Sequence, residues 1–126
     1  MKILIVDDSR IMQVAMKRAL VNAGHEVTVA ADGKQGLLAA RETLPDLILL
    51  DMMLPMMSGI DVLAALKLEV CTRQIPVFVL TGLSQRNQEK LLKAGATRYF
   101  EKSDDFLENN FAALVAAIER CEAKCL

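Results

Sequence analysis

Acidic side chains follow two short apolar runs of this 126-residue sequence, at the point where each run ends. Asp7 and Asp8 come directly after Ile3 to Val6, and Asp51 comes directly after Leu47 to Leu50. If the runs lie side by side, carboxylates about 4 Å apart repel each other by about 4 kcal/mol at an effective dielectric of about 20. A hard divalent cation such as Mg²⁺, which prefers oxygen ligands, would resolve this conflict.

Two later apolar runs end in residues that could bind phosphate. Thr81 follows Pro76 to Leu80, and Lys102 follows Thr97 to Glu101. A phosphoryl group carries a charge of about −1.5 to −2, which a metal, a hydroxyl and an ammonium group neutralise from several sides. Carboxylates form aspartyl-phosphate intermediates, so Asp51 is the candidate nucleophile.

The runs that carry these residues have the length and composition of strands buried on both faces of a parallel sheet. Segments with helical periodicity separate them; Met12, Ala15, Met16, Ala19 and Ala23, for example, share one face of a first helix. The pattern predicts strands over 3–6, 26–30, 47–50, 76–80 and 97–101. It predicts five helices, the second over 33–43 after an Asp32 cap, the third from Ser58, the fourth over 84–94 and the fifth along 107–125.

Alternating strands and helices predict an α/β fold with a doubly wound, five-stranded parallel sheet in the flavodoxin-like order 2-1-3-4-5. In such sheets ligands bind outside the carboxyl ends of the strands, where the strand order reverses. That point lies between the first and third strands, which brings Asp7, Asp8 and Asp51 together. The length and the 53% hydrophobic content fit one domain over residues 1–126.

Composition excludes several classes of function. The formal net charge of −1 lacks the basic excess of a nucleic-acid binder. The longest apolar run, Phe111 to Ile118, falls far short of the about 20 residues of a membrane span. The three cysteines include no C-x-x-C pair, which argues against a secreted disulfide scaffold. We therefore expect a soluble cytoplasmic protein that binds neither nucleic acid nor membranes.

The chain resembles the receiver domains of bacterial response regulators. The resemblance covers residues 2 to 122 and rests on Asp7-Asp8, the run D-M-M-L-P-M-M-S-G over 51–59, Thr81-Gly82, and K-A-G-A over 93–96 followed by Tyr99 and Lys102. It implies a phosphorylation switch in a two-component system or phosphorelay. A histidine kinase or a histidine phosphotransfer protein would supply the phosphoryl group in a Mg²⁺-dependent reaction, so that the chain signals instead of turning over a substrate.

The resemblance also implies roles for single residues around the metal. Asp51 would be the phosphoacceptor. Asp8 and Asp51 would bind Mg²⁺ through their carboxylates, Asp7 would help through water, and the backbone carbonyl of Met53 would complete the protein ligands.

The remaining implied roles belong to the ends of the last two strands. Thr81 would donate a hydrogen bond to a phosphoryl oxygen, Lys102 would pair with another, and Tyr99 would turn inward as Thr81 moves. The chain departs from the family at Lys102-Ser103, where the family usually has a proline after a cis bond. A cis bond before a non-proline residue costs about 2.5–4 kcal/mol, so we expect a trans bond here.

Two surfaces are candidates for partners. Ile11, Val14 and Arg18 face away from the core stripe of the first helix. The resemblance to receivers implies a docking patch for a kinase here, although scattered apolar side chains are also normal on surfaces. A downstream effector would bind the face made by the fourth helix, the fifth strand and the fifth helix. A monomer is expected, or a phosphorylation-dependent homodimer through this same face.

The alternative function is a Mg²⁺-dependent phosphatase of the haloacid-dehalogenase type, which also uses an aspartate at a strand end. That family places its nucleophile in a D-x-D sequence after the first strand and commonly carries a cap, whereas this chain has adjacent aspartates and no residues left for a cap.

Outside these motifs, His25 is expected to be a solvated loop residue. Cys121 and Cys125 could form half of a soft-metal site, but we expect them to pack along the apolar stripe of the fifth helix.

Overall fold

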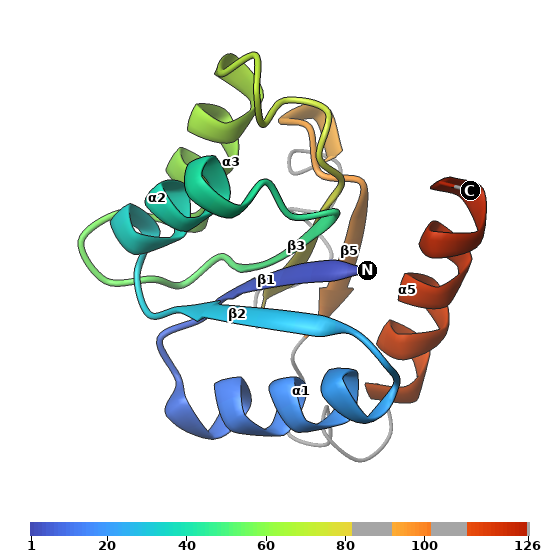
Figure 1. Cartoon of the computed structure of the whole chain (residues 1–126). Coiled ribbons are helices and arrows are strands. Elements are labelled where there is room, and N and C mark those ends of the chain that lie inside the picture. The colour runs from blue at the N-terminus through green and yellow to red at the C-terminus, as the bar shows by residue number, and fades with distance from the viewer. Residues whose placement is uncertain (82–91, 102–110, 126) are drawn as a thin grey trace.

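The computed structural model describes residues 1–81, 92–101 and 111–125. Five parallel strands form one sheet in the order β2-β1-β3-β4-β5 (Figure 1). Their bounds are Lys2–Val6 for β1, Glu26–Ala30 for β2, Leu47–Asp51 for β3, Val77–Thr81 for β4 and Arg98–Glu101 for β5. The predicted fold class and strand order are confirmed.

Four helices are defined in the described part of the chain. They are α1 (Arg10–Asn22), α2 (Gly33–Thr43), α3 (Gly59–Leu68) and α5 (Phe111–Cys125). Helices α2 and α3 cover one face of the sheet, and α1 and α5 cover the other (Figure 1). Most of the fourth helix predicted over 84–94 falls on 82–91, outside the described residues.

The core occupies both faces of the sheet because successive side chains of a strand point to opposite sides. The α2 and α3 side buries Leu4, Val6, Ile48, Leu50, Val77 and Val79, each at most 1% exposed. The α1 and α5 side buries Ile3, Ile5, Leu47, Leu49, Phe78 and Leu80 to the same extent. Burying one such side chain stabilises the fold by about 1.5–3 kcal/mol, which explains why these strands are apolar on both faces.

Polar caps start the helices that follow the strands. Ser9 Oγ accepts a hydrogen bond from the N–H of Met12 (3.4 Å), and Asp32 Oδ1 accepts one from the N–H of Gln35 (2.8 Å). Ser58 Oγ accepts from the N–H of Asp61 at 3.3 Å. Caps satisfy backbone N–H groups that have no partner inside the helix, and those at Ser9 and Ser58 fix the ends of the loops that leave β1 and β3.

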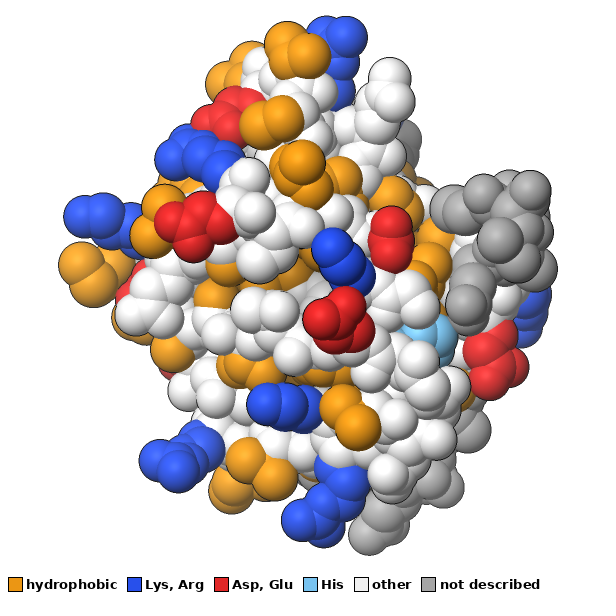
Figure 2. Space-filling model, viewed as in Figure 1, with side chains coloured by type: hydrophobic (Ala, Val, Ile, Leu, Met, Phe, Trp, Pro, Cys, Tyr) orange, Lys and Arg blue, Asp and Glu red, His pale blue; other side chains and the backbone are white. Residues whose placement is uncertain are grey.

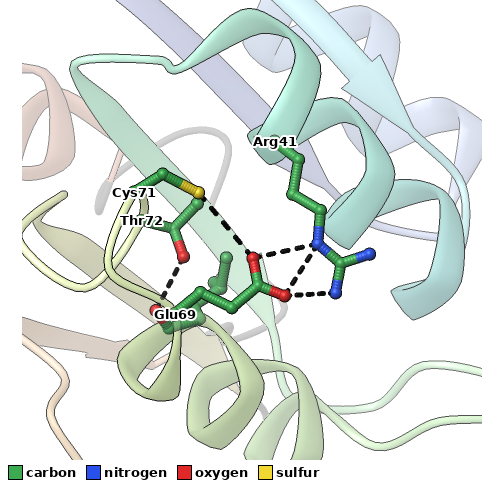
Figure 3. A network of polar contacts seen from close by, with 5 residues as sticks. Arg41, Glu69, Cys71 and Thr72 are labelled. Carbon is green, nitrogen blue, oxygen red and sulfur yellow. Dashed lines mark hydrogen bonds and ion pairs between the residues drawn. The ribbon is translucent and has the colours of Figure 1, made fainter.

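A polar network ties α2 to the segment after α3 (Figure 3). The Arg41 guanidinium donates to both carboxylate oxygens of Glu69, with Nε at 2.8 and 2.9 Å, and Thr72 Oγ1 donates to the carbonyl of Leu66 at 2.7 Å. The hydrogen bonds from Arg41 hold the pKa of the Glu69 carboxyl below its ordinary value. The network fixes the carboxyl end of α3, whose amino end borders the acidic loop.

The prediction for His25 is wrong. Its side chain is 7% exposed, and its Nδ1 lies 3.1 Å from the terminal amine of Met1. Strands β1 and β2 pair from Lys2 and Glu26 onward, and the N–H of Glu26 donates to the carbonyl of Met1 at 3.1 Å. This register places Met1 beside His25. The half-buried Cys121 packs against the α1 and α5 side of the core, as predicted, whereas the side chain of Cys125 lies outside the described part of the chain.

Candidate functional site

Three carboxylates converge at the carboxyl ends of β1 and β3. Asp7, Asp8 and Asp51 each offer an oxygen, and these oxygens lie within 4.8 Å of one another. Asp7 is 0% and Asp51 is 4% exposed, whereas Asp8 is exposed. The predicted convergence is present, with two carboxylates in the protein interior and one open to solvent.

The sheet register explains why these residues meet. Val6 of β1 lies opposite Leu50 of β3. The residues that follow these two in the sequence, Asp7 and Asp51, therefore reach the same edge of the sheet. The N–H of Asp7 donates to the carbonyl of Ala30 at 3.0 Å, which continues the β1–β2 ladder into the loop. Because β2 and β3 flank β1 on opposite sides, the strand order reverses at this point.

Loop amides hold two of the carboxylates in place. Asp7 Oδ1 accepts a hydrogen bond from the N–H of Ser9 at 2.8 Å, and Asp51 Oδ1 accepts one from the N–H of Met53 at 3.1 Å. The side-chain amide of Gln13 on α1 donates to the backbone carbonyl of Asp7. These contacts orient the carboxylates but do not cancel three negative charges.

The donor set fits a hard divalent cation. All three side chains offer carboxylate oxygens, two are withdrawn from water, and such a cluster is unfavourable without a cation to balance it. Mg²⁺ binds one or two carboxylates together with carbonyls, waters and phosphate oxygens, and the exposed side at Asp8 leaves room for them. A soft metal would need thiolate or imidazole ligands, and this cluster contains neither.

Gly59 lets α3 begin directly against the acidic loop. A Cβ at Gly59 would lie 2.5 Å from the backbone oxygen of Asp51 and 2.5 Å from Cα of Met52. Both distances are shorter than a Cβ atom can keep from backbone atoms without a clash. The N–H of Gly59 donates to the carbonyl of Met52 at 3.1 Å. The sequence motif contained this glycine, but its role in the packing becomes clear only in the fold.

The residues at the ends of β4 and β5 are described in part. Thr81 ends β4 opposite Glu101 of β5, and the preceding Leu80 lies opposite Asp51, so Thr81 reaches the same edge as the acidic cluster. Lys102 lies outside the described residues. The half-buried Tyr99 packs against the α2 and α3 side of the core. Burial raises the pKa of its hydroxyl, and the Glu101 carboxylate raises it further.

The candidate docking residues on α1 are exposed. Ile11 is 75% and Val14 is 50% exposed, and Arg18 is exposed beside them. Figure 2 shows basic side chains in blue and hydrophobic side chains in orange together over α1, at the bottom of the view. The patch is therefore mixed in character, apolar with a positive charge.

Two hollows adjoin this patch, and one of them reaches the acidic cluster. One, of about 340 Å³, is lined by Val14, Lys17, Arg18, Val21 and Asn22. The other, of about 440 Å³, shares Val14 and Lys17 and reaches Asp8. Sequence reasoning missed Lys17 and Val21, although their spacing of three and seven residues from Val14 places them on the same helix face.

None of the helices that the structure describes combines the length and the apolar character needed to span a bilayer.

Comparison with known proteins identifies the domain. Residues 3–116 match the family model of the response regulator receiver domain. The response regulator PleD of Caulobacter vibrioides is 38% identical over 105 residues, which cover 82% of this chain and 23% of PleD. The chain thus spans about a quarter of the length of this curated relative.

Solved structures agree in fold. The receiver domain of the Francisella response regulator 1452 superposes with a TM-score of 0.85 at 28% identity, covering 99% of this chain and 98% of that one. The receiver domain of a Pseudomonas aeruginosa sensor histidine kinase, with a magnesium ion coordinated in its active site cleft, gives a TM-score of 0.80 at 30% identity and 94% coverage of both chains. These comparisons do not support the alternative function, a phosphatase of the haloacid-dehalogenase type. The chain belongs to the response regulator receiver domain family, the phosphoacceptor switches of two-component signalling.

Proposed function

We propose that this receiver accepts a phosphoryl group on the Asp51 carboxylate in a Mg²⁺-dependent reaction and thereby changes the surface that it offers to partners. The observation that carries the proposal is the acidic cluster. Its three carboxylate oxygens lie within 4.8 Å of one another at a sheet edge where two of the side chains are buried.

The position of Asp51 in the sheet favours it as the acceptor. It ends β3, which lies between β1 and β4, so it neighbours both the Asp7-Asp8 pair and Thr81. In the transfer, the bond from phosphorus to the donor atom breaks and a bond from phosphorus to an Asp51 oxygen forms. The groups that neutralise the transferred charge must then surround Asp51, and the sheet order supplies them on both sides.

Asp8, Asp51 and the backbone carbonyl of Met53 would hold the metal directly, and Asp7 would hold it through water. When bound, Mg²⁺ neutralises the acidic cluster and draws charge from a phosphoryl oxygen. The Met53 N–H already bonds to Asp51 Oδ1 at 3.1 Å, so the loop that carries the carbonyl folds back toward the carboxylate.

Thr81 and Lys102 would read the phosphorylated state. The Thr81 hydroxyl would donate to one phosphoryl oxygen, and the Lys102 ammonium would pair with another. Tyr99 lies on β5 opposite Val79 of β4, two residues before Thr81, and would turn inward as Thr81 moves. A swing from 1:99 to 99:1 between the two states requires about 5.5 kcal/mol of differential stabilisation, which these contacts would supply.

The proposed partners would bind two different surfaces. A histidine kinase or a histidine phosphotransfer protein would dock on α1 at Ile11, Val14 and Arg18, next to Asp8. A downstream effector, or a second copy of the chain, would bind the face made by the helix predicted over 84–94 together with β5 and α5. The only chemistry of the domain would be its own phosphorylation and dephosphorylation.

Incubation with acetyl phosphate and Mg²⁺, followed by intact mass spectrometry, tests the acceptor. We expect the wild type to gain the mass of one phosphate and Asp51→Asn to gain none. Asp46→Asn is the matched control, because Asp46 is exposed and accepts a hydrogen bond from the N–H of Lys2 at the opposite edge of the sheet. Equal labelling of Asp51→Asn and wild type would refute the assignment.

A further inference from the structure

A cavity of about 380 Å³ lies between β4, β5 and α5. Among its lining residues are Phe78 of β4, Thr97 directly before β5, Arg98 at the start of β5, and Ala117, Arg120 and Cys121 of α5. Figure 1 shows β5 in orange and α5 in red on the same side of the molecule. The lining belongs to the amino-terminal ends of the strands, so the cavity opens at the edge of the sheet opposite the acidic cluster.

The floor of the cavity is apolar. Phe78 and Ala117 are 1% and 2% exposed and belong to the core, and the half-buried Cys121 packs against the same cluster. The ring of Phe78 meets the ring of Phe100 with centroids 5.8 Å apart at an angle of 44°. Because the floor is part of the packed core, it keeps its shape without a ligand.

The rim of the cavity is positively charged. Arg98 and Arg120 are exposed, come from two different elements and line the same space, and no carboxylate is among the described lining residues. The guanidinium carbon of Arg98 lies 5.6 Å from the centroid of the Phe100 ring, a cation–π contact that holds the side chain over the aromatic surface. Within the described part of the chain, neither arginine forms an ion pair.

We propose that this cavity binds a small aromatic carboxylate. Its carboxylate would lie between Arg98 and Arg120, and its ring would lie over Phe78, Ala117 and Cys121. Guanidinium groups bind carboxylates through two parallel hydrogen bonds. Small-molecule sites are commonly cavities of about 300–1,000 Å³ that are lined mostly by apolar side chains and by a few polar groups.

The distribution of exposed apolar side chains favours a small molecule over a peptide. A helical partner inserts several apolar anchors, and its receptor surface offers a row of exposed apolar side chains to receive them. Among the side chains that the structure describes, no large exposed hydrophobic one belongs to β4, β5 or α5. The apolar surface here is recessed behind two arginines, which suits a flat ligand with one charged end.

The site is separate from the acidic cluster. Val77 and Thr81 are the two ends of β4, and the four steps from one to the other along a strand span about 13 Å. Binding in the cavity should therefore not require Asp51, and the proposal does not depend on the phosphorylation chemistry.

Titration of the ¹⁵N-labelled chain with 2-naphthoate, followed by two-dimensional NMR, tests the site. We expect saturable shifts at the amides of Thr97, Arg98, Ala117 and Cys121. Arg98→Gln and Arg120→Gln should each weaken binding at least fivefold. The neutral analogue 2-naphthalenemethanol should bind at least tenfold more weakly than the carboxylate.

Two control variants separate the site from other effects. Arg10→Gln removes an exposed arginine of α1 that does not line the cavity, and Asp51→Asn changes only the acidic cluster; both should bind 2-naphthoate as the wild type does. Circular dichroism establishes that each variant is folded. Shifts that do not saturate, arginine variants that bind normally, or an alcohol that binds as tightly as the carboxylate would each overturn the proposal.

Discussion

Cα of Gly59 approaches the backbone of Asp51 so closely that an added Cβ would lie 2.5 Å from the Asp51 carbonyl oxygen. Helix α3 therefore begins in contact with the end of β3. The obstacle is backbone, which cannot rotate away as a side chain can, so any side chain at this position must displace the loop that carries the Asp51 carboxylate.

Gly59→Ala is predicted to destabilise the domain by about 1–3 kcal/mol, the usual range for overpacking a tight contact. It should also slow labelling by acetyl phosphate, because the displaced loop shifts Asp51 and Met53. Urea denaturation and intact mass measure the two effects. Ala64→Ser adds an atom on the exposed face of the same helix and should change stability by less than about 0.5 kcal/mol. A Gly59→Ala variant as stable as this control would contradict the close contact.

Removing one charge from the acidic cluster is predicted to stabilise the metal-free domain. Asp8→Asn relieves like-charge repulsion, and because Asp8 is exposed the gain should be about 1 kcal/mol or less. Thermal unfolding in EDTA and in excess Mg²⁺ tests this. The variant should melt at a higher temperature than the wild type in EDTA and lose that advantage in Mg²⁺, since the wild type then gains more stability from the metal.

In the same buffers, EDTA should abolish phosphorylation of the wild type, and persistent labelling in EDTA would argue against a metal role.

The loop after β3 contains a residue in a strained conformation. Met56 has a φ of 67°, a left-handed backbone conformation that is unfavourable for a residue other than glycine. Its side chain is 97% exposed, so burial does not offset this cost. Asparagine adopts this conformation more readily, so Met56→Asn should stabilise the domain by about 0.5–1 kcal/mol. Met53→Asn, at an exposed position of the same loop where φ is not positive, should bring no such gain. Equal effects of the two substitutions in urea denaturation would mean that the strain is absent.

The Arg41–Glu69 pair predicts a pH dependence of stability. Hydrogen bonding from Arg41 lowers the pKa of the Glu69 carboxyl in the folded state from its ordinary 4.5. A carboxyl whose pKa is lower when folded stabilises the fold above its unfolded pKa, and this contribution is lost as the pH falls through the folded pKa. Glu69→Gln should therefore lower stability at pH 7 and approach the wild type at pH 3. Glu42→Gln, which removes an exposed carboxylate of α2, should show no comparable change between the two pH values.

The α1 surface predicts a donor-specific defect. Ile11→Lys should slow phosphotransfer from a protein donor about tenfold, because it adds a charged side chain to the proposed docking surface at an apolar position that is 75% exposed. Labelling by acetyl phosphate should stay unchanged, since a small donor needs no docking surface. Leu38→Lys makes the same exchange on α2, where the side chain is 52% exposed, and should spare both reactions. Equal slowing of both donors by Ile11→Lys would remove α1 from the docking surface.

The meeting of Asp7, Asp8 and Asp51 could be predicted from the sequence because it follows from two local facts. Each apolar run ends directly before an acidic residue, and parallel strands bring their carboxyl ends to one edge of the sheet. The caps at Asp32 and Ser58 could be predicted for a similar reason, since a helix N-terminus selects short polar side chains within three residues of its own start.

Features that depend on packing could not be predicted in this way. His25 is buried because the register of β1 and β2 brings Met1 beside it, and no local pattern carries that register. The contact between Gly59 and Asp51 and the left-handed backbone of Met56 arise from the route of one loop over the sheet edge. The cavity at Arg98 and Arg120 joins residues of two elements that are distant in the sequence, and only the tertiary fold brings them together.

A crystal structure of the protein grown with Mg²⁺ and beryllofluoride, a mimic of the phosphoryl group, tests the central claim most directly. We predict the metal among the carboxylates of Asp8 and Asp51 and the carbonyl of Met53, and the beryllofluoride on an Asp51 oxygen. Thr81 and Lys102 should contact its fluorine atoms. A structure in which the acidic cluster stays empty at saturating concentrations, or in which the mimic binds elsewhere, would contradict the account.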